Sequence, residues 1–180
     1  SALTYTYKRN TLNTGFWYEY GQFTESRFFS ETPLLGQGTP GDPTSHYPTD
    51  IFRTLWKEQF QTNTFQFFLQ DTYKITDNLK VNAGFRSLYV HEGNSVPYQN
   101  VAVNGGTIAQ GNLTAANAFL PQVSINWRFF PKNELFFDVS HNMRAFPQDG
   151  YGTSVSATPW TVSNAAFNRK LKPETDWVYE

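Results

Sequence analysis

The residues of this sequence that could do chemistry are few and scattered. The three histidines, His46, His91 and His141, lie far apart, and none has a second His, an Asp or a Glu at metal-ligand spacing. The chain contains no Cys, which excludes a disulfide framework and a thiolate metal site. No Ser-His-Asp arrangement and no pair of carboxylates stands out. We therefore predict no metal site, no catalytic residue and no cofactor, and we do not expect an enzyme.

One loop has the residue types of a ligand-contact surface. Residues 147–170 carry Tyr151, Trp160 and Phe167 among Gly, Ser and Thr residues. Aromatic rings can stack on sugars or on aromatic chelators, and loops on a rigid scaffold commonly carry binding. We therefore predict that these three residues contact the ligand. The alternative is that the rings form an aromatic belt or pack within the loop.

Composition narrows the class of protein. The net charge is −1, so no basic field indicates a nucleic-acid partner. The mean hydropathy is −0.53, and no apolar run approaches the ~18 residues of a transmembrane helix. Aromatic residues make up 18% of the chain and charged residues only 16%. Aromatic girdles at two membrane interfaces would account for this excess, and so would a carbohydrate-binding sandwich rich in Trp and Tyr.

The elements that must position these residues are long strands with one aromatic and one polar face. In residues 118–146, apolar residues from Phe119 to Phe129 alternate with mostly polar neighbours, and the alternation resumes at Leu135 after a turn. A membrane-crossing β-strand needs about 9–11 residues, whereas a strand of a soluble sandwich has about 5–6. In a barrel the aromatic face meets lipid and the polar face meets the lumen. The pattern therefore favours antiparallel transmembrane strands.

Short and long connections alternate along the chain. We predict about six strands, including residues 11–29, 51–75, 79–91 and a last strand that begins near residue 171. The predicted short turns are at 76–78 and 132–134, and the long connections are at 32–50, 92–117 and 147–170. Residues 101–108, within the second long connection, resemble a small hairpin with an Asn-Gly turn. Short turns at one rim and long loops at the other are typical of an up-and-down outer-membrane β-barrel.

The two predicted hairpins allow strand registers to be written down. If the three turn residues 76–78 stay unpaired, the apolar residues of the first hairpin coincide on one face. The expected pairs are Tyr73 with Val81, Leu69 with Phe85 and Phe68 with Arg86. The same arithmetic places Arg128 opposite Asp138 in the second hairpin, where the pair would contribute roughly 0.2–1 kcal/mol.

The charged members of the polar faces are candidates for the wall of the lumen. They are Glu19, Lys57, Arg86, Arg128, Asp138 and Arg144. One interpretation is a hydrogen-bonded wall that holds water or a further domain. The other is a basic ligand path formed by Arg86, Arg128 and Arg144.

The sequence also resembles the barrel of TonB-dependent outer-membrane receptors. The resemblance rests first on Phe-Leu-Gln-Asp-Thr-Tyr-Lys-Ile-Thr-Asp-Asn-Leu-Lys-Val-Asn-Ala-Gly-Phe-Arg at residues 68–86. It is supported by Leu120-Pro121 before a strand, by Asn133-Glu134-Leu135-Phe136 after a turn, and by Leu171-Lys172-Pro173-Glu174-Thr175 leading to Tyr179-Glu180. These motifs follow one another in the order shown by that family.

The resemblance implies a barrel of about 22 strands around an N-terminal plug, in the bacterial outer membrane and surrounded by its lipid. Such a receptor takes up a scarce ligand with energy relayed by the TonB complex. The ligand would be a ferric siderophore or another large nutrient such as a carbohydrate. Six strands cannot close a barrel, so we expect residues 1–180 to be part of the barrel domain of a longer receptor, without its plug and C-terminal strands. The alternatives are a passive porin or adhesin-type barrel and, less favoured, a soluble β-sheet carbohydrate-binding module.

Overall fold

The computed structural model describes residues 1–30, 51–100, 108–146 and 171–180. These residues form one sheet of seven strands, in which every neighbouring pair is antiparallel and the spatial order follows the sequence. The strands are β1 (Ala2–Tyr7), β2 (Asn10–Ser30), β3 (Ile51–Lys74), β4 (Leu79–Gln99), β5 (Gly111–Phe130), β6 (Asn133–Arg144) and β7 (Glu174–Tyr179). The described parts of the chain hold no helix that is long and apolar enough to cross a membrane.

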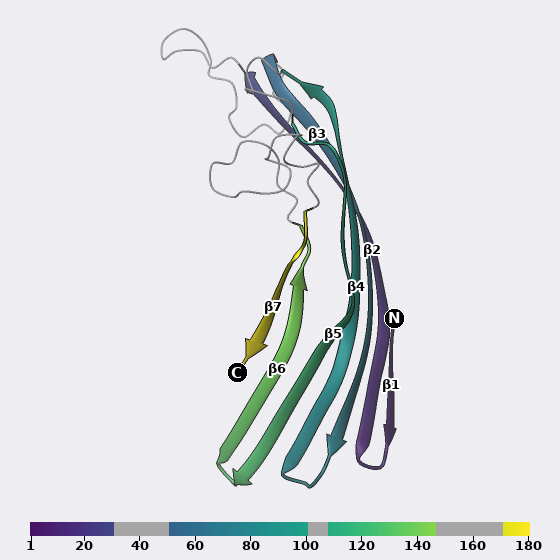
Figure 1. Cartoon of the computed structure of the whole chain (residues 1–180), viewed down its shortest axis with the longest axis vertical. Coiled ribbons are helices and arrows are strands. Elements are labelled where there is room, and N and C mark those ends of the chain that lie inside the picture. The colour runs from purple at the N-terminus through teal and green to yellow at the C-terminus, as the bar shows by residue number, and fades with distance from the viewer. Residues whose placement is uncertain (31–50, 101–107, 147–170) are drawn as a thin grey trace, which may run out of the picture.

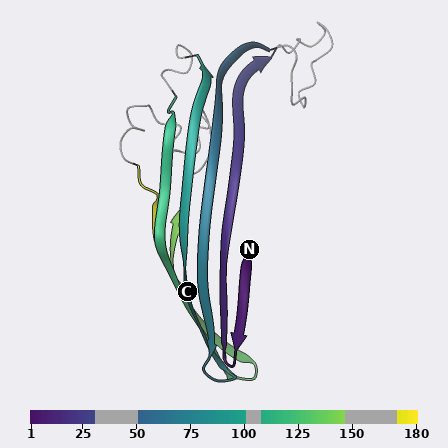
Figure 2. The ribbon, with the colours of Figure 1, turned by 90° about the vertical axis from the view of Figure 1, so that its right-hand side faces the viewer.

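The sheet is a tall wall that curves from one edge to the other. Figure 1 shows the strands running side by side from β1 to β7. In Figure 2 the convex side faces the viewer across β2 to β5, while β6 and β7 curve away behind β5. Within the described residues β1 and β7 are the two edges, and they do not pair with each other. The fold is therefore all-β, antiparallel and up-and-down, as predicted, and the sheet is open.

Several strand boundaries differ from those predicted. The strand β1 was missed, so the described sheet has seven strands rather than about six. Its six residues are too few for a convincing alternation signal. The strands β4 and β5 extend into residues 92–117, which were wrongly predicted as a connection. Gly and Asn suggested a loop there, but pairing with neighbouring strands overrides such local preferences.

Three predicted loop features lie outside the described residues. They are the loop at 32–50, most of the small hairpin at 101–108, and the aromatic loop at 147–170. The short turns are described: β1 and β2 are joined at Lys8 and Arg9, where Lys8 has a φ of 54°. Arg9 also donates a hydrogen bond from Nη1 to the carbonyl of Ile75 at 2.6 Å, which links two neighbouring turns at this rim.

The predicted register of the first hairpin is confirmed. The observed pairs include Tyr73 with Val81, Leu69 with Phe85 and Phe68 with Arg86. The apolar side chains of β3 and β4 therefore share one face.

The predicted register of the second hairpin is wrong. Arg128 lies opposite Glu134, and Asp138 lies opposite Ser124. The prediction left residues 132–134 unpaired, but the turn is shorter because pairing begins at Asn133, and a bulge follows between Arg128 and Phe130. The partner of Arg128 moves by four positions, an even number, so Arg128 and Asp138 keep the polar face to which they were assigned.

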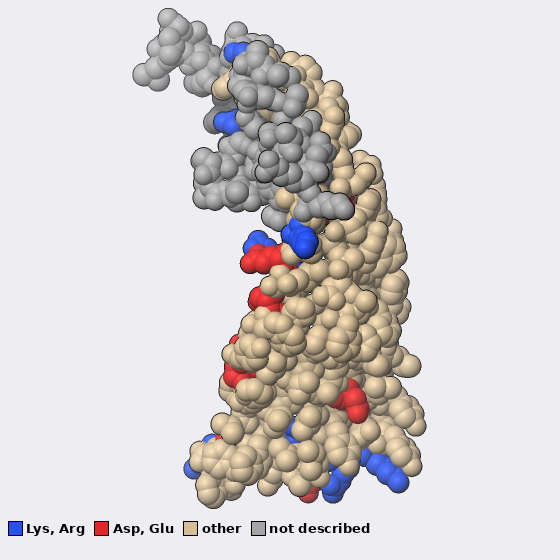
Figure 3. All heavy atoms as spheres, in the orientation of Figure 1, with Lys and Arg blue, Asp and Glu red and all other residues tan. Residues whose placement is uncertain are grey.

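The convex face carries a continuous band of aromatic and aliphatic side chains. In one row across the sheet, the ring centroids of Tyr18 and Phe65 are 4.7 Å apart, and those of Phe65 and Tyr89 are 6.2 Å apart. On β4 the band spans residues 79–89, the length that a tilted strand needs to cross a bilayer. Asp71 is an exception, because its register position falls on this face. Figure 3 shows that Lys, Arg, Asp and Glu gather mainly near the short turns and along the β6–β7 edge.

The concave face carries the polar residues and, toward the long connections, a small apolar core. This core contains Phe60, Val90, Leu120, Met143 and Phe146, all buried. The two faces thus differ in kind: the convex one exposes its large apolar side chains, and the concave one buries some of its own. A single sheet with this polarity needs an apolar medium on one side and a polar interior on the other.

Candidate functional site

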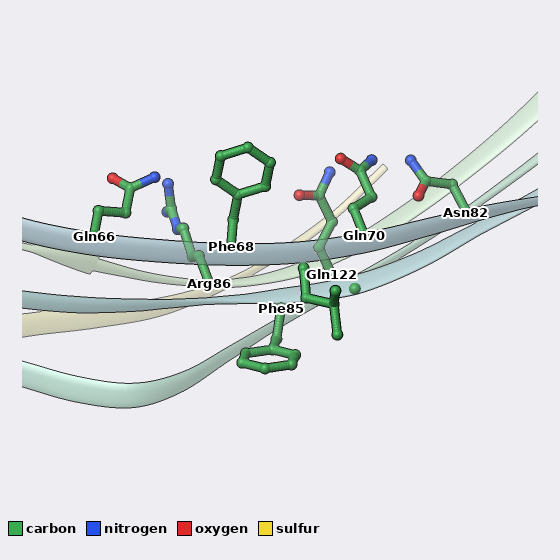
Figure 4. A pocket seen from close by; sticks show the side chains of 9 residues that line it. Gln66, Phe68, Gln70, Asn82, Phe85, Arg86 and Gln122 are labelled. Atoms are coloured by element: carbon green, nitrogen blue, oxygen red, sulfur yellow. The ribbon is translucent and has the colours of Figure 1, made fainter. Parts of the chain in front are cut away.

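A pocket of about 210 Å³ lies in the middle of the concave face. It is lined by Gln66, Phe68, Leu69 and Gln70 of β3, by Asn82, Gly84, Phe85 and Arg86 of β4, and by Gln122 of β5. We call it the amide pocket, because four of its side chains are carboxamides. Figure 4 shows those four side chains, with Phe68 and Arg86, on one side of the strands and the ring of Phe85 on the other.

The register explains why these side chains meet. Gln70 is opposite Gly84, and Gly84 is opposite Gln122, so one row of the sheet crosses three strands through the pocket. The next row on the same face places Phe68 opposite Arg86. Because side chains alternate between faces, residues two apart on each strand line the same surface. The pocket is thus built from regular strands rather than from loops.

Two glycines set how closely the strands and rings approach. A Cβ at Gly84 would lie against the carbonyl oxygen of Leu69 and 2.8 Å from the Cα of Gln70. A Cβ at Gly15 would lie 2.5 Å from the ring of Phe68. The ring of Phe68 therefore occupies the space above Gly15, where any other residue would place its side chain. This contact fixes the aromatic wall of the amide pocket.

The side chain of Arg86 on β4 reaches across β5 and forms a hydrogen bond with a residue of β6. Its Nη2 donates a hydrogen bond to Oδ1 of Asn142 at 2.6 Å, reaching past β5 to β6. Leu120, which is opposite Arg86 on β5, is only 1% exposed. The guanidinium is thus tied to β6 beside a buried leucine, and one cation takes a defined position at the rim of the amide pocket.

The contact between Arg86 and Asn142 is expected to stabilise the sheet measurably. In a double-mutant cycle with Arg86→Leu and Asn142→Leu, we expect a coupling free energy of about 1.5–3 kcal/mol, the range for a hydrogen bond to a charged group. The measurement is the free energy of unfolding of the refolded receptor in denaturant. Additive single effects, with a coupling near zero, would show that the two side chains do not interact.

The structure brings together some of the predicted polar residues but not all. Arg86 lines the amide pocket, and Arg144 is two residues along β6 from its partner Asn142. Arg128 is eight residues along β5 from Leu120, the residue opposite Arg86, which is about 26 Å at 3.3 Å per residue. By strand parity all of these, and Asp138, fall on the concave face. Arg128 therefore does not adjoin the other two arginines.

The predicted aromatic contacts Tyr151, Trp160 and Phe167 lie outside the described residues. The carboxamides of the amide pocket were not singled out from the sequence. Their only signal was the parity of Gln66 and Gln70 on one strand, and nothing local linked them to Gln122. The described residues contain no group of three or more His, Asp or Glu side chains that could hold a metal ion.

The amide pocket can make many neutral hydrogen bonds. Each carboxamide offers two N–H donors and one carbonyl acceptor, and Arg86 adds donors only. Oδ1 of Asn82 has no hydrogen-bond partner among the described residues. The amide pocket therefore suits a polar partner with hydroxyl groups, either a ligand or another protein surface, better than a strongly charged one.

A comparison with protein families connects this geometry to a known architecture. A family model described as "TonB dependent receptor-like, beta-barrel" matches residues 2–180. A search of curated proteins found no match for the chain. The family consists of transporters of the outer membrane of Gram-negative bacteria, not of enzymes. The match covers all of the described strands, and their antiparallel order and two-faced polarity are those of such a barrel. The chain belongs to the TonB-dependent receptor β-barrel family.

Proposed function

We propose that the chain is part of the barrel of a longer outer-membrane receptor, which binds a scarce nutrient and takes it up with energy relayed by the TonB complex. The family match over residues 2–180 is the observation that carries this proposal. The aromatic band on the convex face supports contact with outer-membrane lipid, because such bands form the lipid-facing surface of barrels. The concave face then lines the lumen, with Arg86, Arg128, Asp138 and Arg144 on it.

The open sheet supports the view that more strands complete the barrel. In lipid an unpaired strand edge leaves backbone groups without partners, at a cost of several kcal/mol each. Sequencing the parent gene on both sides of this stretch tests the proposal. We expect a plug-like domain upstream and further strands downstream. Flanking sequence without either would contradict it.

The nutrient is a ferric siderophore or another large compound such as a carbohydrate. The experiment is uptake by the parent bacterium under iron limitation, and on defined carbohydrates, after deletion of the receptor gene. We expect the loss of uptake of one such nutrient, restored by the gene in trans. We also expect deletion of TonB to abolish uptake as fully as deletion of the receptor. Uptake that persists without TonB would favour the alternative, a passive porin.

A further inference from the structure

A second pocket lies on the concave face, nearer to the long connections than the amide pocket. Its volume is about 430 Å³, and we call it the upper pocket. Its floor is formed by two adjacent rows of the sheet, Gly21–Thr62–Glu92 and Glu19–Thr64–Val90. Ala145 and Phe146, which follow β6, also line it. The upper pocket thus lies between the sheet and the chain that leaves β6, separate from the amide pocket.

Glu92 is a buried acid whose hydrogen bonds are incomplete. Its side chain is only 3% exposed, and its Oε2 has no hydrogen-bond partner among the described residues. Oγ1 of Thr62, opposite Glu92 on β3, also lacks a partner there. An unpaired buried carboxylate is costly, so a group that completes its hydrogen bonds stabilises it. Both atoms belong to side chains that line the upper pocket.

The rest of the lining defines what could pair with Glu92. A second carboxylate, Glu19, lines the same pocket, and none of the described lining residues is Lys or Arg. The remaining large side chains are the apolar Leu88, Val90 and Phe146. No third carboxylate or imidazole completes a metal site in the described chain. The complement of this lining is a compound with one positive, hydrogen-bond-donating group and an apolar body. A volume of about 430 Å³ is within the range of small-molecule sites.

We propose that the upper pocket binds a small organic ammonium compound, with its charged nitrogen at Glu92 and its apolar body against Val90 and Phe146. This goes beyond the proposed uptake function, because binding to the purified receptor requires neither TonB nor transport. A failure of the binding experiment is therefore distinguishable from a failure of uptake.

The pH dependence of binding follows from the position of Glu92. This residue lies three positions beyond Tyr89, outside the aromatic band, and burial raises the pKa of its carboxyl from 4.5 to about 7. The other acids nearby are Glu19 on β2 and Glu58 on β3, whereas Leu113 of β5 and the lining residues Ala145 and Phe146 add no charge. An ammonium group pairs with the ionised carboxylate, which predominates above the raised pKa. Binding should therefore weaken as the pH falls from 8 to 6.

The test uses the full-length receptor in detergent micelles and three probes of similar size, each with a phenyl ring and a different charge. They are 2-phenylethylammonium, the neutral 2-phenylethanol and the anionic phenylacetate, measured by ligand-observed NMR and calorimetry. We expect binding of the ammonium compound alone. Glu92→Gln should weaken it about tenfold or more, as for loss of one charge-assisted hydrogen bond, and should remove the change between pH 8 and pH 6.

Two further variants guard against a trivial loss of folding. Gly21→Leu should abolish binding by filling the pocket, since a Cβ at Gly21 meets no atom within 4 Å and needs no backbone shift. Asp138→Asn is the matched control, because it removes a carboxylate of the same face outside the pocket, and it should leave the affinity unchanged. Equal binding of all three probes, no binding of the ammonium compound, or unchanged affinity in Glu92→Gln and Gly21→Leu would each overturn the proposal.

Discussion

Replacement of Val123 by arginine is expected to destabilise the membrane-inserted receptor by about 2–4 kcal/mol, the cost of a cation near the midplane on the lipid face of a barrel. Val123 is on the aromatic face, opposite Ala83 on β4 and Val139 on β6, and it is 41% exposed. Its row is inside the band at residues 79–89 of β4. The guanidinium would be placed in hydrocarbon, with an alanine and a valine as its nearest neighbours in the row. Phe137→Arg, on the neighbouring strand, should act in the same direction.

The measurement is the free energy of unfolding of the receptor reconstituted in lipid vesicles, from a denaturant titration followed by Trp fluorescence. The matched controls are Ser124→Arg and Ser140→Arg, whose side chains fall on the concave face by strand parity. Both should stay within about 0.5 kcal/mol of the wild type, as for surface substitutions. Equal losses on both faces would show that the assignment of the lipid face is wrong.

Replacement of Gly84 by alanine is expected to cost about 1–3 kcal/mol, the usual range for overpacking at a site that cannot relax. The added Cβ would meet backbone atoms of β3, among them the Cα of Gln70 at 2.8 Å, rather than the flexible end of a side chain. The strands β3 and β4 must then move apart at the centre of the amide pocket. The unfolding free energy of the receptor should therefore fall, and any ligand held by Gln70 and Gln122 should bind more weakly.

Gly21→Ala is the control for this experiment, because it makes the same chemical change in a strand of the same sheet. The space around Gly21 is open, with no atom within 4 Å of an added Cβ. Alanine should be neutral there, or stabilise by up to about 0.5–1 kcal/mol through lower conformational entropy of the unfolded chain. If Gly84→Ala and Gly21→Ala had the same effect, close packing at Gly84 would not be the cause.

The two faces of the sheet have different roles, and the expected effect of a substitution depends on the face that carries it. Substitutions on the convex face act on insertion in lipid, whereas those on the concave face act on pockets that contain Arg86 or Glu92. A substitution at Gly84 should affect both stability and binding, because the close backbone packing at this residue shapes the amide pocket. Substitutions on the convex face can therefore change stability in lipid without altering the residues that line the two pockets.

The sequence by itself determined the class of fold and the faces of most residues in the strands that flank the short turns at 76–78 and 132–134. Alternation is a local property with a period of two, so Val123 and Ser124 could be assigned to opposite faces without knowledge of their neighbours. The alternation of short turns with long connections, and the motif at residues 68–86, were also local. Even the wrong register at Arg128 left the faces intact, because the error was an even number of residues.

Only the tertiary structure decided which residues meet. The partner of Arg128 depends on the length of a turn and on a bulge, and neither is visible in the alternation. The contact of Arg86 with Asn142 joins strands that are not neighbours, and the amide pocket needs Gln70 and Gln122 in one row. Periodicity fixes the direction of a side chain, but its neighbours depend on the relative shift of whole strands. That shift is set by hydrogen-bond pairing and close packing across the sheet, which no single strand encodes.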